Sequence, residues 1–358
     1  MERHRAEHHE PMPAAPRVNL YSDTQTMPTP AMRRAIAEAE VGDEQQRADP
    51  SVNALCERVA DLLGFEAAMF LPTGSMCNEI GVRLHIRAGG DAIFLHDTSH
   101  ILRYEAGGAA AISGAITIPL DGDRGMYSAD TLDAAVTRAG DRYGPRPRLV
   151  AVEQTTNIGG GCVWPLEQVR AVVGVAKRAG LRTHLDGARL LNASAATGVK
   201  PADWCDGFDT AWIDFTKGLG APLGAALAGA SELIDEAWRY KHMLGGAMRQ
   251  AGMMAAGALY ALDHHVDRLA EDHANAHRLA AGLGEIDGIT MASDAFDTNI
   301  VIFHVDDAPA FVEKMGEHGV LLSHFGATTV RAVTHLDVDE RGIDVAIAAA
   351  RDVCAASG

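Results

Sequence analysis

The sequence predicts an α/β protein built on a mainly parallel sheet, with a second, smaller α/β domain towards the C-terminus. From about residue 50 to residue 255, short apolar runs alternate with segments whose apolar residues recur at helical spacing. After residue 255 the composition shifts towards Ala, His, Asp and Leu in long helical patterns, and two more strand-like runs follow. Strands that alternate with helices form parallel sheets that are covered on both faces.

The elements follow in order along the chain. Ser51 can cap a first helix that carries apolar residues at helical spacing as far as the stop signal at Gly64. A later helix has Pro165 in its first turn and leads to Gly180. The expected strands are 67–71, 91–95, 148–152, 182–186 and 210–214, then 300–305 and 330–335. We therefore expect a disordered leader over residues 1–16, a large domain over 17–255 and a small domain over 256–358.

The composition disfavours several classes of partner and ligand. The 358 residues carry a formal net charge of -17, which argues against a nucleic-acid partner because phosphate contacts need clustered Lys and Arg. No apolar run reaches the ~18 residues of a membrane helix, so we expect no membrane partner. The five cysteines show no metal-ligand spacing and are typical of reduced thiols. The sequence thus predicts a cytoplasmic protein that holds no metal.

One loop between an expected strand and an expected helix carries Thr73, Gly74 and Ser75. Glycine allows the backbone to approach an anion, and hydroxyls and N–H groups at a helix start can bind phosphate. A plain strand-to-helix turn has the same composition, so this loop alone is a weak signal.

Two other loops at strand ends carry charges. Asp186 ends the strand 182–186 and is followed closely by Arg189, while Lys217 lies among glycines after the strand 210–214. Each alone is equally typical of an ion pair or a surface charge. Together with the phosphate-type loop, they predict a pyridoxal-phosphate (PLP) site. The lysine would form a Schiff base, the carboxylate would keep the pyridine nitrogen protonated, and the helix N-terminus would hold the phosphate.

A set of stretches in fixed order extends this pattern over most of the chain. They are Tyr21-Ser22-Asp23-Thr24, Val41-Gly42-Asp43, residues 49–53, Pro72-Thr73-Gly74-Ser75, residues 184–190, Thr216-Lys217-Gly218-Leu219, residues 243–252 and residues 331–337. In these the chain resembles the low-specificity L-threonine aldolases and phenylserine aldolases of the β-eliminating lyase group. The resemblance implies a PLP-dependent transferase fold of type I with a seven-stranded sheet in the large domain.

The resemblance also implies an activity: cleavage of L-β-hydroxy-α-amino acids such as threonine, allo-threonine or phenylserine to glycine and an aldehyde. It further implies a homodimer or homotetramer with shared active sites. Another PLP-dependent lyase or an aminotransferase of the same fold is the alternative. A PLP-binding regulator without turnover and a nicotinamide-binding protein are disfavoured, the latter because no Gly-x-Gly-x-x-Gly follows the first strand.

Site residues follow from the matching positions. The resemblance implies that Lys217 and His100 are catalytic, with His100 stacking on the cofactor ring and serving as the base for the β-hydroxyl. The other implied cofactor contacts are Asp186, Gly74, Ser75, Arg189 and Arg249, the last of them near a dimer interface. Ser22, Arg189 and Arg331 would bind the substrate carboxylate, because a guanidinium presents a planar fork of donors. Taken alone, His100 is more typical of a structural histidine. The alternative for Arg249 is an exposed arginine at a buried helix start, and the alternative for Arg331 is a strand-surface charge.

The chain departs from the family pattern at four places. They are Gln154-Thr155-Thr156-Asn157 where the family usually has Asn-Thr-His-Asn, Tyr143 where it has a second active-site histidine, Thr26-Met27-Pro28-Thr29 where it has Thr-Arg-Pro-Thr, and Gln46-Arg47 where it has Tyr-Gly. The first three are expected in or near the substrate half of the site. The hypothesis that follows is a preference for β-hydroxy amino acids bulkier than threonine, such as phenylserine.

Overall fold

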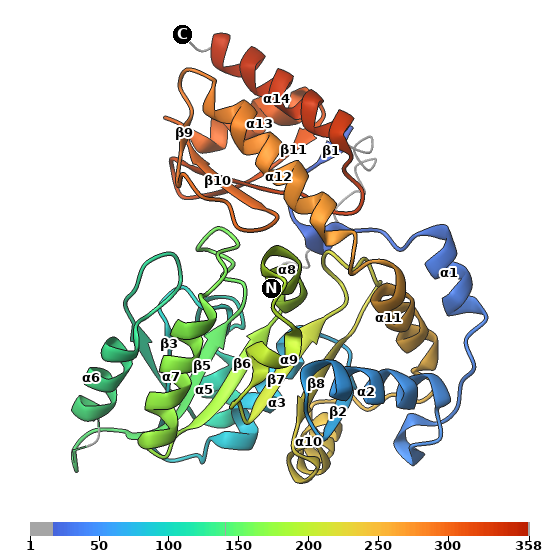
Figure 1. The fold of residues 1–358 in the computed structure, drawn as a ribbon, viewed down its shortest axis with the longest axis vertical. Coiled ribbons are helices and arrows are strands. Elements are labelled where there is room, and N and C mark those ends of the chain that lie inside the picture. Colours follow the sequence, from blue (N-terminus) through green and yellow to red (C-terminus); the bar gives the residue numbers. More distant parts are fainter. Residues whose placement is uncertain (1–16, 140, 357–358) are drawn as a thin grey trace, which may run out of the picture.

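The computed structural model describes residues 17–139 and 141–356, so the expected leader 1–16 lies outside the described residues. The large part is organised around a seven-stranded sheet in the order β2-β8-β7-β6-β5-β3-β4 (Figure 1). β8 is antiparallel to both of its neighbours, and the other pairs are parallel. The strands are β2 Ala67–Leu71, β3 Asp91–His96, β4 Ile116–Leu120, β5 Arg146–Glu153, β6 Arg182–Gly187, β7 Thr210–Asp214 and β8 Ala225–Gly229. The predicted seven-stranded, mainly parallel sheet is confirmed.

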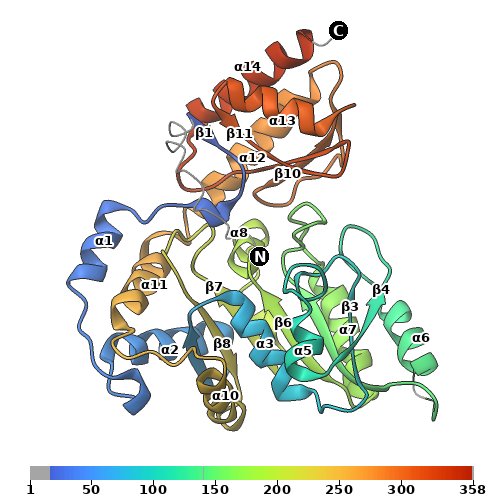
Figure 2. The same cartoon turned by 180° about the vertical axis from the view of Figure 1, so that it is seen from behind.

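Helices cover both faces of this sheet. α6, α7 and α9 lie on the face seen in Figure 1, and α3 and α5 lie on the face seen in Figure 2. The helices of the large part are α1 Pro30–Ala37, α2 Pro50–Leu63, α3 Gly74–His85, α4 His100–Arg103, α5 Gly108–Ser113, α6 Ala129–Ala139, α7 Leu166–Arg178, α8 Leu190–Thr197, α9 Pro201–Cys205, α10 Ser231–Met243 and α11 Gly252–His264. This burial on both faces explains why the central strands are continuous apolar runs.

Two strands of the seven-stranded sheet, β4 and β8, were not predicted. β4 lies at the edge of the sheet, is partly exposed and contains Pro119, which hides its strand character. β8 consists of small residues, Ala-Ala-Leu-Ala-Gly, which have low strand propensity and are placed by burial between β2 and β7.

The start of α2 differs from the prediction. The helix begins at Pro50, and its cap is Asp49, whose Oδ1 accepts a hydrogen bond from the N–H of Val52 at 3.1 Å. Ser51 instead donates its hydroxyl to the carbonyl of Glu40 at 2.6 Å. The stop at Gly64 is confirmed, since this residue has the left-handed φ of 73° that ends a helix.

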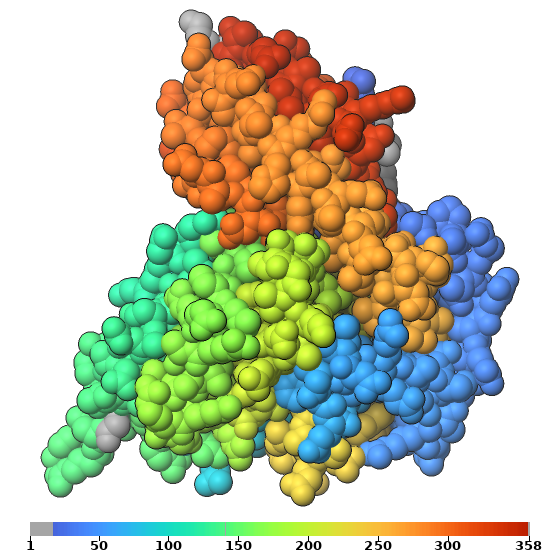
Figure 3. Space-filling view, in the orientation of Figure 1, coloured from blue at the N-terminus to red at the C-terminus, as the bar shows by residue number. Residues whose placement is uncertain are grey.

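The C-terminal part forms its own layer of sheet and helices at one end of the molecule (Figure 3). Its four-stranded antiparallel sheet has the order β12-β13-β10-β9, and a separate pair joins β1 in parallel to β11. The elements are β1 Val18–Asn19, α12 Leu269–Gly284, β9 Thr290–Met291, β10 Ile300–His304, α13 Ala308–Glu317, β11 Val320–Leu321, β12 Ser323–Phe325, β13 Thr329–Val333 and α14 Glu340–Ala355. Val18 and Leu20 are buried in the core of this part, so the start of the chain belongs to it.

The expected boundary at residue 255 falls inside α11. Ala255, Ala258 and Ala261 on this helix are fully buried in the core of the large part, and α11 packs on α1 and α2. The apolar residues of α12 from Ala276 onward belong to the core of the small part. We therefore propose a boundary after α11, with residues 17–20 counted in the small domain. No helix in residues 17–139 and 141–356 is long and apolar enough to span a membrane.

Candidate active site

A cavity of about 450 Å³ lies where the carboxyl ends of the large-sheet strands face the small part. Ligands of open α/β sheets bind at this edge, because loops and helix N-termini converge there. The cavity is lined by Ser22, Gly74, Ser75, His100, Asp186, Arg189, Lys217 and Arg331. Eight of the nine residues expected in the site therefore line one cavity, although they come from distant parts of the chain.

Three adjacent strands each present an acidic residue to this cavity. Glu153 ends β5, Asp186 lies near the end of β6 and Asp214 ends β7. Glu153 and Asp186 are direct partners in the sheet register. The sequence-based interpretation used this strand-end rule for Asp186 alone. Applied to the buried runs 148–152 and 210–214 as well, the same rule would have found Glu153 and Asp214.

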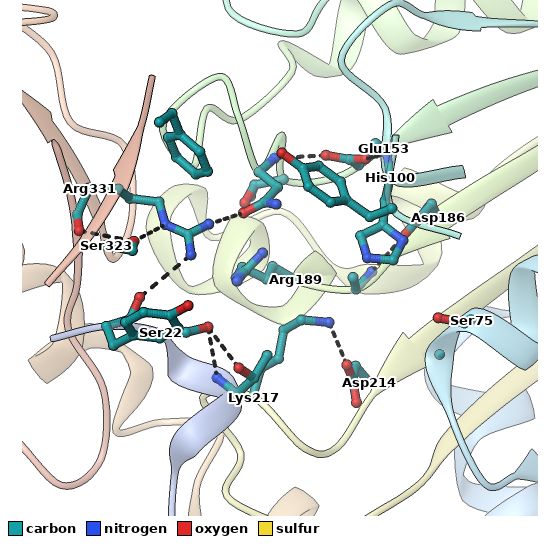
Figure 4. A pocket seen from close by; sticks show the side chains of 18 of the residues that line it. Ser22, Ser75, His100, Glu153, Asp186, Arg189, Asp214, Lys217, Ser323 and Arg331 are labelled. Atoms are coloured by element: carbon teal, nitrogen blue, oxygen red, sulfur yellow. Dashed lines mark hydrogen bonds and ion pairs between the residues drawn. The ribbon is translucent and has the colours of Figure 1, made fainter. Parts of the chain in front are cut away.

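Lys217 lies on the loop after β7, with its side chain only 17% exposed. Its Nζ donates to Oδ2 of Asp214 at 2.5 Å and lies 5.8 Å from the centre of the Trp212 ring. Oδ1 of Asp214 accepts hydrogen bonds from the backbone and the hydroxyl of Thr216, which fixes the carboxylate. The amine is thus held at the floor of the cavity (Figure 4).

Asp186 is 2% exposed and lies on the opposite side of the cavity from Arg331 (Figure 4). Its Oδ1 accepts the N–H of Ala188 at 3.1 Å, and its Oδ2 accepts the side-chain amide of Asn78 at 2.8 Å. Because two donors hold the carboxylate, its position is fixed before any ligand binds.

The N-terminus of α3 opens onto the same cavity. Thr73 caps this helix by accepting the N–H of Met76 at 3.1 Å, and Gly74 and Ser75 line the cavity. A Cβ on Gly74 would lie only 2.4 Å from Cη2 of Trp212, so the close approach of helix and indole requires glycine. The free N–H groups and the partial positive charge of a helix start favour an anion here.

This donor set fits pyridoxal phosphate. An amine at Lys217 suits the aldehyde, a carboxylate at Asp186 suits a protonated ring nitrogen, and the start of α3 suits the phosphate. All three line one cavity. The fit comes from the chemistry of these side chains and agrees with the sequence-based prediction.

His100 lies beside Asp186 and has two acidic neighbours. Its Nδ1 is 2.7 Å from Oε1 of Glu105, and its backbone N–H donates to Oε2 of Glu153 at 2.6 Å. Burial alone would lower the pKa of His100, but the hydrogen bond that it donates to Glu105 and the surrounding negative charges raise this pKa above its ordinary value. Burial, followed by the charge of Asp186, raises the pKa of Glu153 to about 7.

Arg331 enters the cavity from β13 of the small part. Its donors reach Ser323 Oγ at 3.2 Å, Asn157 Oδ1 at 3.0 Å and the carbonyl of Tyr21 at 3.5 Å. Within the described part of the chain, no carboxylate lies within ion-pair distance of this guanidinium. Burial, together with the positive charge of Arg189, lowers its pKa. Arg331 is therefore a buried cation held by neutral groups.

Arg189 already has a carboxylate partner within the chain. It lines the cavity, but Asp23 occupies two of its nitrogens: Nε donates at 2.8 Å and Nη2 at 2.6 Å. Both side chains are nearly fully buried. The fork expected to bind the substrate carboxylate is already bound to a carboxylate of the chain itself. Ser22, which precedes Asp23, lines the cavity and accepts two hydrogen bonds from Thr24.

The ninth expected site residue, Arg249, lies outside the cavity of this chain, and so does Tyr143, which stands where the family has a histidine. Arg249 is 62% exposed and pairs with Asp43 at 2.9 Å. Tyr143 is 81% exposed and stacks on the guanidinium of Arg142. Its loop precedes β5, at the end of the sheet opposite the cavity, so within one chain it does not take an active-site position.

The departure at residues 154–157 also looks different in space. Thr155 and Asn157 line the cavity, whereas Gln154 and Thr156 are buried behind it. Oε1 of Gln154 accepts the N–H of Trp164 at 3.1 Å. The two substituted positions therefore support the loop and do not form the wall.

The architecture and the cavity define a PLP-type transferase fold, and comparison of structures agrees. The solved structure of Leishmania major threonine aldolase aligns with a TM-score of 0.82 and 20% identity, covering 94% of this chain and 99% of that one. The family model of the β-eliminating lyases matches residues 19–308. The chain therefore belongs to the β-eliminating lyase family.

Curated relatives are similar over nearly their whole length. Low-specificity L-threonine aldolase 1 of Arabidopsis thaliana is 37% identical over 327 residues, which is 89% of this chain and 91% of the relative. The low specificity L-threonine aldolase of Escherichia coli strain K12 is 38% identical, covering 90% of this chain and 94% of the relative. The resemblance stated from the motifs is confirmed.

Proposed function

We propose that this protein is a pyridoxal-phosphate enzyme that cleaves L-β-hydroxy-α-amino acids to glycine and an aldehyde. The observation that carries the proposal is the placement of Lys217, Asp186 and Arg331 around one cavity. The first two suit the cofactor, and the third offers a substrate carboxylate a cation whose partners are neutral. The names of the relatives, low-specificity L-threonine aldolases, support the same activity.

Each side chain has a defined task. Lys217 would hold the cofactor through its amine, and Asp186 would keep the ring nitrogen protonated. When bound, the cofactor would supply an electron sink for the pair released from the breaking bond. Arg331, with Ser22 close by, binds the substrate carboxylate and so orients the bond that is to break. Arg189 stabilises this wall through Asp23 and has Nη1 left for the ligand.

The proton of the β-hydroxyl goes to His100. Its Nδ1 is committed to Glu105, so Nε2 is the atom that accepts the proton. The Cα–Cβ bond then breaks, the hydroxyl oxygen becomes the carbonyl oxygen of the aldehyde, and Cα later takes up a proton to give glycine. An aminotransferase needs its base at the α-proton, which distinguishes the two reactions.

We propose a preference for bulky side chains such as that of phenylserine, supported by the aromatic mouth of the cavity. Tyr21, Tyr104 and Phe325 line it, and the two tyrosines are 44% and 48% exposed. The substitutions at Gln154 and Thr156, which lie behind the wall, no longer support this preference.

We also propose a homodimer or homotetramer in which Arg249 serves a neighbouring site. The exposure of Arg249 in its own chain and the exposed Met243 and Met253 nearby support a subunit contact there. A cytoplasmic location is proposed as well, supported by five free thiols.

The test is product analysis without an added keto acid. The purified enzyme with PLP should release benzaldehyde and glycine from L-phenylserine, and acetaldehyde and glycine from L-threonine, with the higher kcat/KM for phenylserine. Lys217→Ala should abolish both, by at least about a thousandfold, and borohydride should attach the cofactor to Lys217 in the unsubstituted enzyme only. Turnover that requires a keto acid acceptor would establish an aminotransferase instead. A higher kcat/KM for threonine would contradict the proposed preference for substrates with a bulky side chain.

A further inference from the structure

Asn78 on α3 is fully buried behind the cavity and joins four side chains. Its Oδ1 lies 2.7 Å from Nε1 of Trp212 and 3.1 Å from Nε2 of His184. Its Nδ2 lies 2.7 Å from Oε1 of Glu105 and 2.8 Å from Oδ2 of Asp186. One amide therefore connects the carboxylate expected at the cofactor ring with the carboxylate that holds His100.

The direction of these hydrogen bonds is fixed by chemistry. The indole N–H of Trp212 can only donate, so the Asn78 atom that faces it must be the oxygen. The nitrogen of Asn78 therefore faces Glu105 and Asp186 and donates one hydrogen to each. An amide turned by 180° would place its oxygen, which only accepts, against both carboxylates and its NH2 group against the indole N–H.

His184 continues the hydrogen-bond chain from Asn78 in the direction away from the cavity. Burial lowers the pKa of His184 to about 3, so the ring is neutral and carries one N–H. This hydrogen must be on Nε2, which donates to Asn78 Oδ1. Nδ1 then accepts the hydroxyl of Thr210 at 2.8 Å, and Thr210 in turn accepts from Nε2 of His85 at 3.0 Å.

The consequence reaches His100. Oε1 of Glu105 accepts from Asn78 and also lies 2.7 Å from His100 Nδ1. Because Oε1 of Glu105 is the acceptor in both contacts, Nδ1 of His100 carries the hydrogen, and Nε2 is the ring nitrogen left to face the cavity. The ionisable groups around His100 are Glu105, Glu153 and Asp186, with Glu79 of α3 next to Glu105.

The backbone of α3 is built to bring Asn78 this close. Gly81 lies three residues further along the same face of the helix, and a Cβ there would be 2.3 Å from Cε1 of His184. With Gly74, whose Cβ would collide with Trp212, the helix has a glycine on each side of Asn78 where it meets β6 and β7. The close contact therefore depends on three positions of one helix face.

We propose that Asn78 is a positioning residue that holds the carboxylate of Asp186 in place and, through Glu105, sets the tautomer of His100, so that both groups respond as one unit. The inference rests on the proposed function for the role of His100 and on the donor set for that of Asp186. Asn78 itself does not line the cavity.

The decisive variant is Asn78→Asp, which keeps the shape and the acceptor for Trp212 but replaces the shared donor with a negative charge. Added negative charge favours the protonated form of His100, whose neutral form is the base. The acid limb of kcat/KM against pH should move up by about one unit, and kcat near pH 7 should fall about tenfold. KM should change much less, because Asn78 touches no substrate. The absorbance titration of the bound cofactor should shift in the same direction.

Asn275→Asp is the matched control. Asn275 is also buried, on α12, and donates its amide to the carbonyl of Val338 at 3.0 Å, away from the cavity. It should lower the melting temperature and leave the acid limb and the cofactor titration in place. If Asn78→Asp leaves both in place too, the proposal is overturned.

A measurement on the unsubstituted holoenzyme covers the case in which Asn78→Asp does not fold. Neutron diffraction from a deuterated crystal should place the two amide deuterons of Asn78 towards Glu105 and Asp186, and one deuteron on Nε2 of His184. The opposite amide orientation overturns the proposal. If the unsubstituted enzyme releases no aldehyde, the proposed function fails, whereas the cofactor titration and the neutron map still decide the role of Asn78.

Discussion

The two walls of the cavity differ in how their charges are compensated. On the wall formed by the large sheet, Lys217 has the carboxylate of Asp214 at 2.5 Å, and Asp186 has two N–H donors. On the wall formed by the small part, Arg331 has only hydroxyl, amide and carbonyl oxygens as partners. On the first wall, each charged group has a partner of opposite charge or N–H donors. On the second wall, the cation of Arg331 has no carboxylate among its hydrogen-bond partners.

This difference indicates which wall meets the substrate. A buried cation without an anion is costly, and the cost falls when an anion binds. A carboxylate that enters the cavity therefore gains most at Arg331. Arg189 gains less, since Asp23 already neutralises it. The contrast supports our proposal that the large sheet holds the cofactor and that β13 provides most of the substrate recognition.

Removing the cation of the second wall should have the largest effect on catalysis. Arg331→Gln removes the cation, and kcat/KM for phenylserine should fall by about a hundredfold to a thousandfold, the range for losing one partner of a buried charged pair. Cofactor absorbance should remain unchanged, because Lys217 and Asp186 are untouched. Arg331→Lys should fall between, since it keeps the charge without the planar fork.

Arg278→Gln is the control for Arg331→Gln. Arg278 also lies in the small part, but it is 48% exposed and pairs with Asp344 outside the cavity. Steady-state kinetics should show no change in this variant. An Arg331→Gln enzyme with the same KM as Arg278→Gln would show that the carboxylate binds elsewhere.

A smaller effect is expected on the first wall. Gly74→Ala places a Cβ 2.4 Å from Trp212, so the indole or the start of α3 must move. Overpacking costs about 1–3 kcal/mol, and the affinity for PLP should fall about tenfold. Titration of the apoenzyme with PLP measures this, and KM for substrate should be normal once cofactor saturates.

Gly316→Ala provides the comparison for Gly74→Ala. Gly316 lies in α13, has no atom within 4 Å of its ideal Cβ and has an ordinary helical φ. Replacing it should leave PLP affinity unchanged and stabilise the helix slightly. Equal PLP affinities in Gly74→Ala and Gly316→Ala would show that the start of α3 does not bind the cofactor.

The two walls also differ in how far the sequence alone predicts them. Lys217, Asp186 and Gly74 follow from local rules, because Asp186 lies at the end of an apolar strand, Lys217 lies on the loop just after one, and Gly74 starts a helix. Arg331 follows only from the family resemblance, since no local pattern separates it from a surface charge. The Asp23–Arg189 pair joins residues 166 positions apart and depends on the path of the N-terminal segment, so no local pattern reveals it.

The same limit applies to the fold. Strands with large β-branched or aromatic residues, such as β7, were predicted with the correct bounds. The alanine-rich β8 and the domain position of α11 were not, because small residues pack where tertiary neighbours place them. Glu105 was missed for a related reason: it ends no strand, and its role depends on the fold bringing it to His100.

Replacing Glu105 changes the pKa of His100, the proposed base, and leaves the charges of Lys217, Asp186 and Arg331 on the two walls unchanged. Apart from burial, which lowers it, the Glu105 hydrogen bond has the largest influence on the pKa of His100 and raises it. Glu105→Gln should therefore lower this pKa and move the acid limb of kcat/KM to lower pH by about one unit, opposite to Asn78→Asp. The neutral base is then present over a wider range, and kcat at alkaline pH should change only a few-fold. Since Glu105 touches neither the ring partner nor the carboxylate clamp, PLP affinity and KM should stay near their original values. An acid limb that does not move would show that the limb belongs to Glu153, whose raised pKa of about 7 is the other titration expected in this range.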